Sequence, residues 1–178
     1  MSSTVMEQQS HRLARAAGGD ADSFATLIEP LLEAAYRLAA VMLADRSTAE
    51  DAVQEASIKA WRKLNQLRGD TGSLRPWFLS IVANECRMTR RQRWWSVVRM
   101  AELEGSRVAA DQESSSDLRR ALMKLGGKDR LALVLHFYLD LPLPETARAL
   151  HVSEAAAKAR VYRAARRLRG DLQLQEVF

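Results

Sequence analysis

The chain has 178 residues, of which 47% are hydrophobic and 28% are charged, and its formal net charge is +5. This balance excludes a disordered tail, and the length suits one ordinary domain or two small ones. The excess of positive charge favours a polyanionic partner, because the cations are concentrated in a few segments rather than spread evenly.

A single cysteine and three histidines limit the chemistry of the chain. Cys86 alone excludes an internal disulfide and a thiolate zinc cluster, and His11, His136 and His151 show no ligand spacing. We therefore expect no cofactor and no metal. No apolar run approaches the roughly twenty residues that span a bilayer, and residues 1–19 lack the apolar core of a secretion signal. The sequence predicts a cytoplasmic protein.

The first predicted helix follows an N-terminal extension, residues 1–19. Apolar residues recur at helical spacing from about Asp22 to Leu43, after an entry marked by Gly18 and Gly19. This stripe predicts an amphipathic helix.

Two further helices are expected before residue 98. Ser47 and Glu50 have the spacing of a capping box, which predicts a second helix reaching about Leu67. A loop follows over residues 68–73, and Pro76 fits the first turn of a third helix. The inward face of the second helix is expected to hold Val53, Ala56, Ala60 and Leu64.

Residues 99–116 are acid-rich, contain Gly and Ser, and lack an apolar stripe, so they are predicted to form a flexible linker. Beyond them, Asp117 can cap a short helix that stops at Gly126, and Asp129 can start another. No segment has the alternation of a strand. We expect an all-α fold with two small helical domains, residues 20–98 and 117–178.

Residues 143–169 have the outline of a DNA-reading helix-turn-helix: a short helix, a tight turn and a longer basic helix. Pro144 fits the first helical position, Ala147 lets a second helix cross closely, and Ser153 can cap that helix. Its expected buried stripe comprises Ala157, Val161, Ala164, Ala165 and Leu168. A solvated surface helix is the alternative, but such helices normally mix charge signs, and no acid lies between Glu154 and Asp171.

Several motifs occur together in the N-terminal half. They are Asp51-Ala52-Val53-Gln54-Glu55, Lys59-Ala60-Trp61, Arg68-Gly69-Asp70, Pro76-Trp77 and Asn84. With the basic helix-turn-helix behind them, they resemble the bacterial extracytoplasmic-function sigma factors, the smallest group of the sigma-70 family. The resemblance extends from about Asp20 to Arg169. It implies a protein without enzymatic activity that binds core RNA polymerase, recognises minus-35 and minus-10 promoter DNA, and is held inactive by an anti-sigma factor, often membrane-bound.

The resemblance assigns polymerase binding to the second helix, which in the family docks on a coiled coil of the largest subunit. The residues assigned here are Glu50, Asp51, Gln54, Glu55 and Ile58. Their acidic and amide groups, with an apolar edge, suit a basic partner helix. The alternative is an acidic helix N-terminus that complements the macrodipole, which explains Glu50 and Asp51 but not the other three.

The minus-10 site is assigned to the loop 68–73 and the helix after it. The family holds one DNA strand there with a base turned out, and the lost stacking must be replaced by polar, aromatic and cationic contacts. The assigned residues are Arg68, Asp70, Thr71, Ser73, Trp77, Asn84, Arg87, Arg90 and Arg91. Arg93 could also track the backbone, and Trp94 or Trp95 could stack on a base, although packing explains the tryptophans equally well. Met88 stands where relatives commonly have an acid, which leaves base preference open.

The minus-35 site is assigned to the basic helix, which in the family enters the major groove. Relatives usually have Gly-Thr-Val-Lys-Ser-Arg where this chain has alanines at 155, 156, 157 and 159. Alanine cannot hydrogen-bond a base edge, although its methyl can touch a thymine methyl. Base reading is therefore expected from Lys158, Arg160, Tyr162 and Arg163, with Ser153 and Glu154 at the helix start, and phosphate contacts from Arg166, Arg167 and Arg169.

Two other functions fit parts of the sequence. A stand-alone helix-turn-helix regulator without polymerase binding would need symmetry or a ligand pocket, and the sequence has no sustained heptad seam. An adaptor whose basic helix binds an acidic protein or a membrane is the other, although the small apolar residues opposite the arginines make membrane insertion weak. Enzymatic activity is not expected, because no nucleophile motif or phosphate-cradling loop is present.

Overall fold

The computed structural model describes the backbone of residues 2–67, 73–104 and 117–171, and the described side chains are those of residues 7–67, 73–92 and 118–171. These residues are helical and contain no strand, which confirms the all-α class. None of the described helices is long and apolar enough to cross a membrane. The α-helices are α1 Ser2–Ala17, α2 Ala21–Leu43, α3 Arg46–Lys63, α4 Leu74–Glu104, α5 Asp117–Lys124, α6 Gly127–Leu133, α7 Leu143–Leu150 and α8 Glu154–Asp171.

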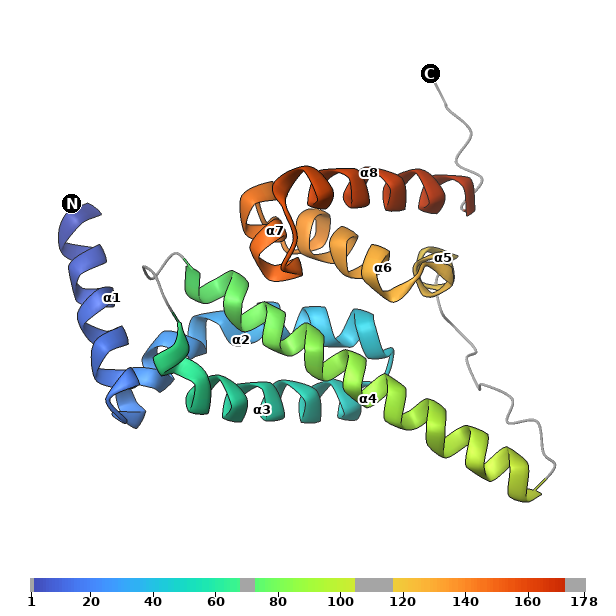
Figure 1. Cartoon of the computed structure of the whole chain (residues 1–178), viewed down its shortest axis with the longest axis horizontal. Coiled ribbons are helices and arrows are strands. Elements are labelled where there is room, and N and C mark those ends of the chain that lie inside the picture. The colour runs from blue at the N-terminus through green and yellow to red at the C-terminus, as the bar shows by residue number, and fades with distance from the viewer. Residues whose placement is uncertain (1, 68–72, 105–116, 172–178) are drawn as a thin grey trace.

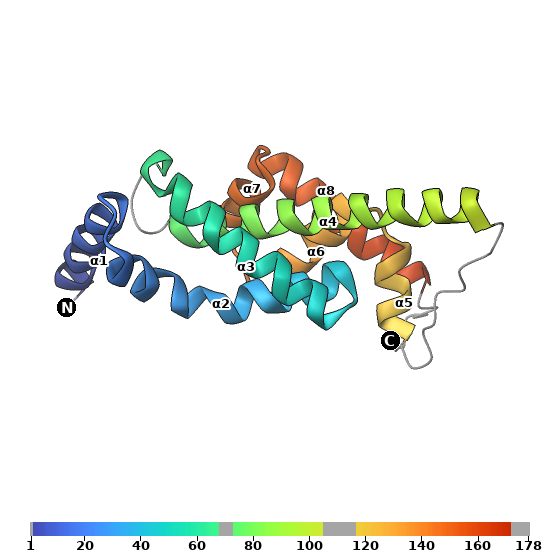
Figure 2. The same ribbon diagram turned by 90° about the horizontal axis from the view of Figure 1, so that it is seen from below.

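The helices form two layers. Helices α2, α3 and α4 contact one another and make the lower layer in Figure 1, and α6, α7 and α8 lie over it. Figure 2 shows α4 running along most of the length of the molecule, where its N-terminal half contacts α2, α3 and α7. Helix α1 stands at one end against α2, and α5 lies at the other end.

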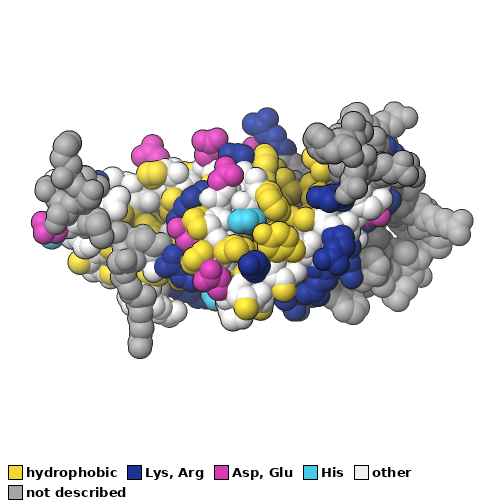
Figure 3. All heavy atoms as spheres, turned by 90° about the horizontal axis from the view of Figure 1, so that it is seen from above, with side chains coloured by type: hydrophobic (Ala, Val, Ile, Leu, Met, Phe, Trp, Pro, Cys, Tyr) yellow, Lys and Arg dark blue, Asp and Glu magenta, His cyan; other side chains and the backbone are white. Residues whose placement is uncertain are grey.

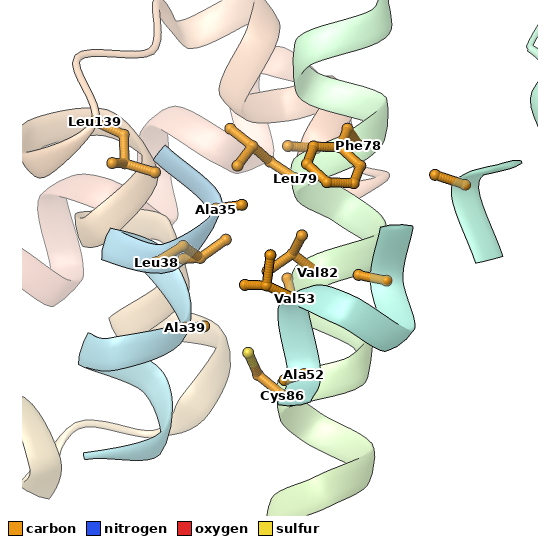
Figure 4. Close-up of a cluster of buried hydrophobic side chains, with 14 of the residues drawn as sticks. Ala35, Leu38, Ala39, Ala52, Val53, Phe78, Leu79, Val82, Cys86 and Leu139 are labelled. Atoms are coloured by element: carbon orange, nitrogen blue, oxygen red, sulfur yellow. The ribbon is translucent and has the colours of Figure 1, made fainter. Parts of the chain in front are cut away.

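The main core lies where α2, α3 and α4 meet (Figure 4). Leu38, Val53, Phe78 and Val82 are fully buried there, and Leu139 reaches the same cluster from the C-terminal half. Helix α3 contributes mostly alanines to this contact, so its backbone can approach α2 and α4 closely. Burial also raises the pKa of the Cys86 thiol to about 12, so that this cysteine is a protonated core residue at neutral pH.

Helix α1 forms within the expected N-terminal extension and was not predicted. Its sequence is mostly polar, and among its described side chains only Ala16 is fully buried, against α2. The joint between the helices is polar: the Asp20 carboxylate pairs with Arg15 at 2.7 Å and accepts a hydrogen bond from Ser23 Oγ at 2.6 Å. That hydrogen bond, followed by the Arg15 charge, lowers the pKa of Asp20.

The capping box predicted at Ser47 and Glu50 is wrong. The N-cap of α3 is Asp45, whose carboxylate accepts from the Thr48 backbone N–H at 2.9 Å. Glu50 bonds Arg46 instead, at 3.0 Å. The reason is that α2 ends in a left-handed Ala44, with φ of 61°, which makes Asp45 the first extended residue before α3.

Helix α6 also begins earlier than predicted. Its N-cap is Gly126 rather than Asp129, which lies within the first turn, and the helix continues into a π-helical turn over Val134–Tyr138. Arg130 is wholly buried at this end and donates to the carbonyl oxygens of Leu122, Met123 and Leu125 at 2.8, 2.9 and 3.1 Å. These carbonyls lie at or just beyond the end of α5, where a helix leaves its last carbonyls without i+4 partners, and Leu122 O also accepts from the Leu125 backbone N–H at 3.2 Å. Burial, followed by the charge of Arg90, lowers the pKa of Arg130 to about 10.

The two layers share one hydrophobic cluster. Leu131, Leu135 and Leu141 of the C-terminal half belong to the same buried cluster as Leu38 and Phe78. Helix α4 extends through Glu104, into the segment expected to be a linker, and residues 105–116 lie outside the described residues. The division of the chain into domains stays a prediction.

Arginines bridge the two layers. Arg37 of α2 donates to the Tyr138 carbonyl at 2.8 Å, and its guanidinium lies 4.2 Å from the centre of the Tyr138 ring. Arg75 of α4 donates to the Leu139 carbonyl at 2.8 Å, and Arg119 of α5 donates to the Ala44 carbonyl at 2.5 Å. Each bond joins a side chain of one layer to a backbone carbonyl of the other.

Candidate nucleic-acid and protein interfaces

The acidic residues of α3 lie on one exposed face. Glu50, Asp51, Gln54 and Glu55 are exposed, and Ile58 is 37% exposed beside them. Their spacing of three, four and seven residues places them on one side of a helix, while Ala49, Ala52, Val53, Ala56 and Ala60 bury the other side. The expected polymerase-binding residues are thus brought together on a surface free of core packing.

Lys59, the cation that directly follows this stretch of α3, points elsewhere. Its Nζ atom lies 2.5 Å from Glu85 Oε2 on α4, and the Glu85 carboxylate is almost completely buried. This pair fastens α3 to α4 and keeps Lys59 from neutralising Asp51 and Glu55, whereas Glu50 is paired with Arg46. Sequence alone does not reveal the pair of Lys59 and Glu85, because these residues are 26 positions apart and no local spacing connects them.

Part of the expected minus-10 site lies along α4. Ser73 and Trp77 are half-buried at its start, and Asn84 and Arg87 are exposed further along, where Arg87 Nη2 donates to Asn84 Oδ1 at 3.3 Å. Arg91 is exposed one turn beyond Arg87. Arg68, Asp70 and Thr71 lie outside the described residues, as do the side chains of Arg93, Trp94 and Trp95.

Arg90 is exposed but faces the other layer. Its Nη1 atom is 3.9 Å from the point where a Cβ on Gly127 would lie, so it sits beside the start of α6 rather than with Asn84 and Arg87. Helix α7 approaches the opposite end of α4: Arg148 Nη1 lies 3.5 Å from Ser73 Oγ. A cavity of about 320 Å³ remains at that end, lined by Gln66, Leu67, Ser73, Trp77, Arg148 and His151.

The helix-turn-helix forms as predicted. Helix α7 ends at a left-handed His151, with φ of 54°, and Ser153 Oγ accepts from the Ala156 backbone N–H at 3.2 Å, which confirms Ser153 as the cap of α8. Ala147 is buried where α7 contacts α8. Of the expected buried stripe of α8, Ala157, Val161 and Ala164 are fully buried, and Ala165 and Leu168 are partly buried.

The cations of α8 fall into two groups. Lys158, Arg163, Arg166 and Arg169 are exposed, as are Tyr162, Glu154 and the alanines at 155, 156 and 159. Figure 3 looks down on this layer and shows Lys and Arg side chains gathered beside an area of hydrophobic ones. Arg160 and Arg167 instead pair with Asp129 of α6, with N–O distances of 4.0 and 3.2 Å.

An apolar groove opens between the two layers near α5. It has a volume of about 640 Å³, and Phe137, which is 58% exposed, lies on its wall. Tyr138 and Leu118, which are 44% and 48% exposed, line the same groove. The other apolar lining residues include Val41, Leu122, Met123 and Leu168, and two cationic residues, Arg119 and Arg169, also line the groove.

Two family models match the chain. Residues 27–96 match Sigma-70 region 2, and residues 115–168 match Sigma-70, region 4. The first match contains α3 and most of α4, and the second contains α5 to α7 and most of α8.

Similar proteins cover nearly the whole chain. The RNA polymerase sigma factor NccH of Alcaligenes xylosoxydans xylosoxydans is 30% identical over 92% of this chain and 94% of its own length. The ECF RNA polymerase sigma factor SigM of Mycobacterium tuberculosis is 32% identical over 88% of this chain and 80% of its own length.

Two solved structures have the same fold. CnrH, in complex with the cytosolic domain of CnrY, superposes with a TM-score of 0.71 and 24% identity, covering 94% of this chain and 99% of CnrH. The sigma factor RpoE of Bartonella quintana, in complex with the anti-sigma factor NepR, superposes with a TM-score of 0.68 and 23% identity, covering 86% of this chain and 98% of RpoE. The chain belongs to the sigma-70 family, in its extracytoplasmic-function group.

Proposed function

We propose that this chain directs core RNA polymerase to promoters by using α3 to hold the polymerase and α4 and α8 to hold DNA. The observation that carries this proposal is the separation of charge: an exposed acidic face on α3 and an exposed cationic face on α8 lie on different layers. Polymerase and duplex DNA can then bind without competing for one surface. A regulator without polymerase binding leaves the acidic face and the region 2 match unexplained.

Asn84, Arg87 and Arg91 are the described residues that we propose for the melted minus-10 strand. The exposed guanidinium groups suit strand phosphates, and the Asn84 amide, already bonded to Arg87, can bond a base edge. The roles of Arg68, Asp70 and Thr71 rest on the family resemblance alone. Arg90 faces α6, so among the assigned arginines it is the one least able to contact the minus-10 strand in this arrangement.

Simultaneous contact with both promoter elements requires the layers to separate. The minus-35 and minus-10 elements are, by their names, about 25 base pairs apart, or about 85 Å at 3.4 Å per base pair. In the present arrangement α7 touches the start of α4, where Arg148 meets Ser73 at 3.5 Å. We therefore infer that this is the form of the free chain and that α5 to α8 leave α4 when the promoter is bound.

The test combines transcription with charge reversal. Core polymerase with the full chain should produce transcripts from a randomised promoter library. The double variant Asp51→Lys with Glu55→Lys should weaken polymerase binding by about tenfold or more, because the new lysines repel the basic partner helix. The matched control is Glu29→Lys with Glu33→Lys, an equal charge change at the same spacing on exposed positions of α2. Equal loss of polymerase binding in both variants, or no transcripts from the unaltered chain, would contradict the proposal.

We further propose that an anti-sigma factor holds the chain inactive, as the complex of RpoE with NepR suggests. The apolar groove offers such a partner surface from both layers, and a bound helix there would keep the layers together. Phe137→Asp should release the chain from its anti-sigma factor in a pull-down, because it places a charge in the groove. Met88→Asp, outside the groove, serves as the control, and equal binding by the unaltered chain and Phe137→Asp would exclude the groove.

A further inference from the structure

Asp129 of α6 stands between two of the arginines that the sequence assigns to DNA. Its Oδ1 atom is 4.0 Å from Arg160 Nε and its Oδ2 atom is 3.2 Å from Arg167 Nη1. The two arginines are seven residues apart, which is two helical turns, so they occupy the same side of α8. One carboxylate on α6 therefore holds two cations of the recognition helix.

The Asp129 carboxylate is shielded from solvent, and the two arginines are exposed to different extents. The Asp129 side chain is only 15% exposed, against 25% for Arg160 and 62% for Arg167. Asp129 lies in the first turn of α6, where the helix macrodipole favours a negative charge. If both arginines turned to DNA phosphates, they would leave a largely buried carboxylate unpaired, and a buried unpaired charge is strongly unfavourable.

The remaining cations of α8 have no such anchor among the described salt bridges. These cations, Lys158, Arg163, Arg166 and Arg169, are exposed, and α8 packs against α5, α6 and α7 through its other side. The neighbouring residues Arg166 and Arg167 thus carry the same charge but differ in whether an acid already neutralises it.

We propose that Asp129 acts as a positioning residue that withholds Arg160 and Arg167 from DNA, so that the contacts of α8 come from Lys158, Tyr162, Arg163, Arg166 and Arg169. This inference rests on the proposed function of α8 and makes it more specific. Non-specific affinity for DNA is mainly electrostatic, so withholding two cations weakens it more than it weakens sequence-specific binding. Asp129 thereby raises the ratio of specific to non-specific binding.

The experiment measures the salt dependence of duplex binding by the full chain, with a labelled duplex of unrelated sequence followed by fluorescence anisotropy. The slope of log affinity against log salt is negative, and Arg166→Ala should make it shallower by about 0.9, the value of one lost phosphate contact. Arg167→Ala removes the same charge one residue away and should leave the slope at its original value. Asp129→Asn should steepen the slope, by as much as about 0.9 for each released arginine.

Two outcomes overturn the role of Asp129 without affecting the proposed DNA-binding role of α8. A slope that falls equally in Arg166→Ala and Arg167→Ala, or stays unchanged in Asp129→Asn while circular dichroism shows a folded chain, overturns the role of Asp129 alone. A loss of folding in Asp129→Asn leaves the comparison of the two alanine variants decisive. If the unaltered chain fails to bind duplex at low salt, the DNA-binding role of α8 is wrong, and the role of Asp129 falls with it.

Discussion

A buried arginine stabilises the end of α5. Arg130 is the largest fully buried side chain among the described residues, and it donates to carbonyls at the end of α5 rather than to a carboxylate. Helix α5 has only eight residues, too few to be stable alone. The Arg130 guanidinium therefore replaces the hydrogen bonds that a longer helix would provide, and its pKa of about 10 keeps it charged at neutral pH.

Replacing Arg130 should test this capping role. Arg130→Met, which keeps much of the volume but none of the donors, should lower the free energy of unfolding by about 3 kcal/mol, because several buried carbonyls lose charge-assisted bonds. Urea denaturation followed by circular dichroism measures it. Lys128→Ala, at an exposed position two residues away, should change stability by no more than about 0.5 kcal/mol. A stable Arg130→Met variant would show that the carbonyls find other partners.

Among the elements, the sequence predicts the helices that have an apolar stripe together with a start signal. Helices α2 and α8 lie where their apolar stripes put them, and the Ser153 cap is confirmed. Helix α1 is not predicted, because its sequence is mostly polar and its position depends on packing against α2. The predicted starts of α3 and α6 are wrong, because the N-caps are Asp45 and Gly126. Several residues near each helix start could act as the cap, and the path of the preceding turn decides which of them does.

In the candidate site, too, local spacing predicts some features, and helix packing decides the others. That Glu50, Asp51, Gln54 and Glu55 share one exposed face was predictable, since helical spacing alone requires it. The departure of Arg90 from the group containing Asn84 and Arg87 was not, because it depends on where α6 lies against α4. The Arg68 loop lies outside the described residues, so its part in the site stays a prediction.

At the scale of the whole chain, the important feature is that the two layers close on each other. The Arg37 guanidinium stacks on Tyr138 and bonds its carbonyl, and the apolar cluster continues across the contact. If promoter binding separates the layers, as we propose, this contact opposes activity in the free chain. The strength of the contact then sets the fraction of chains that are open.

Weakening this contact should open the molecule. Arg37→Ala removes one cation–π contact and one hydrogen bond, together worth about 1.4 kcal/mol, which should increase the ratio of open to closed chains about tenfold. Small-angle X-ray scattering should show a larger radius of gyration, and promoter binding with core polymerase should strengthen. Arg12→Ala, an exposed arginine of α1, is the control and should change neither. An unchanged scattering profile in Arg37→Ala would mean that the apolar cluster alone keeps the layers closed.

Local order along the chain was enough to establish the helices, the helix-turn-helix and the two charged faces, because helical periodicity, caps and charge runs act between residues a few positions apart. It could not establish which charges are used inside the molecule. Lys59 pairs with Glu85 across 26 residues, and Arg167 pairs with Asp129 across 38. Those pairs exist only because packed helices cross at particular points, so the packing decides which arginines of α8 remain available to DNA.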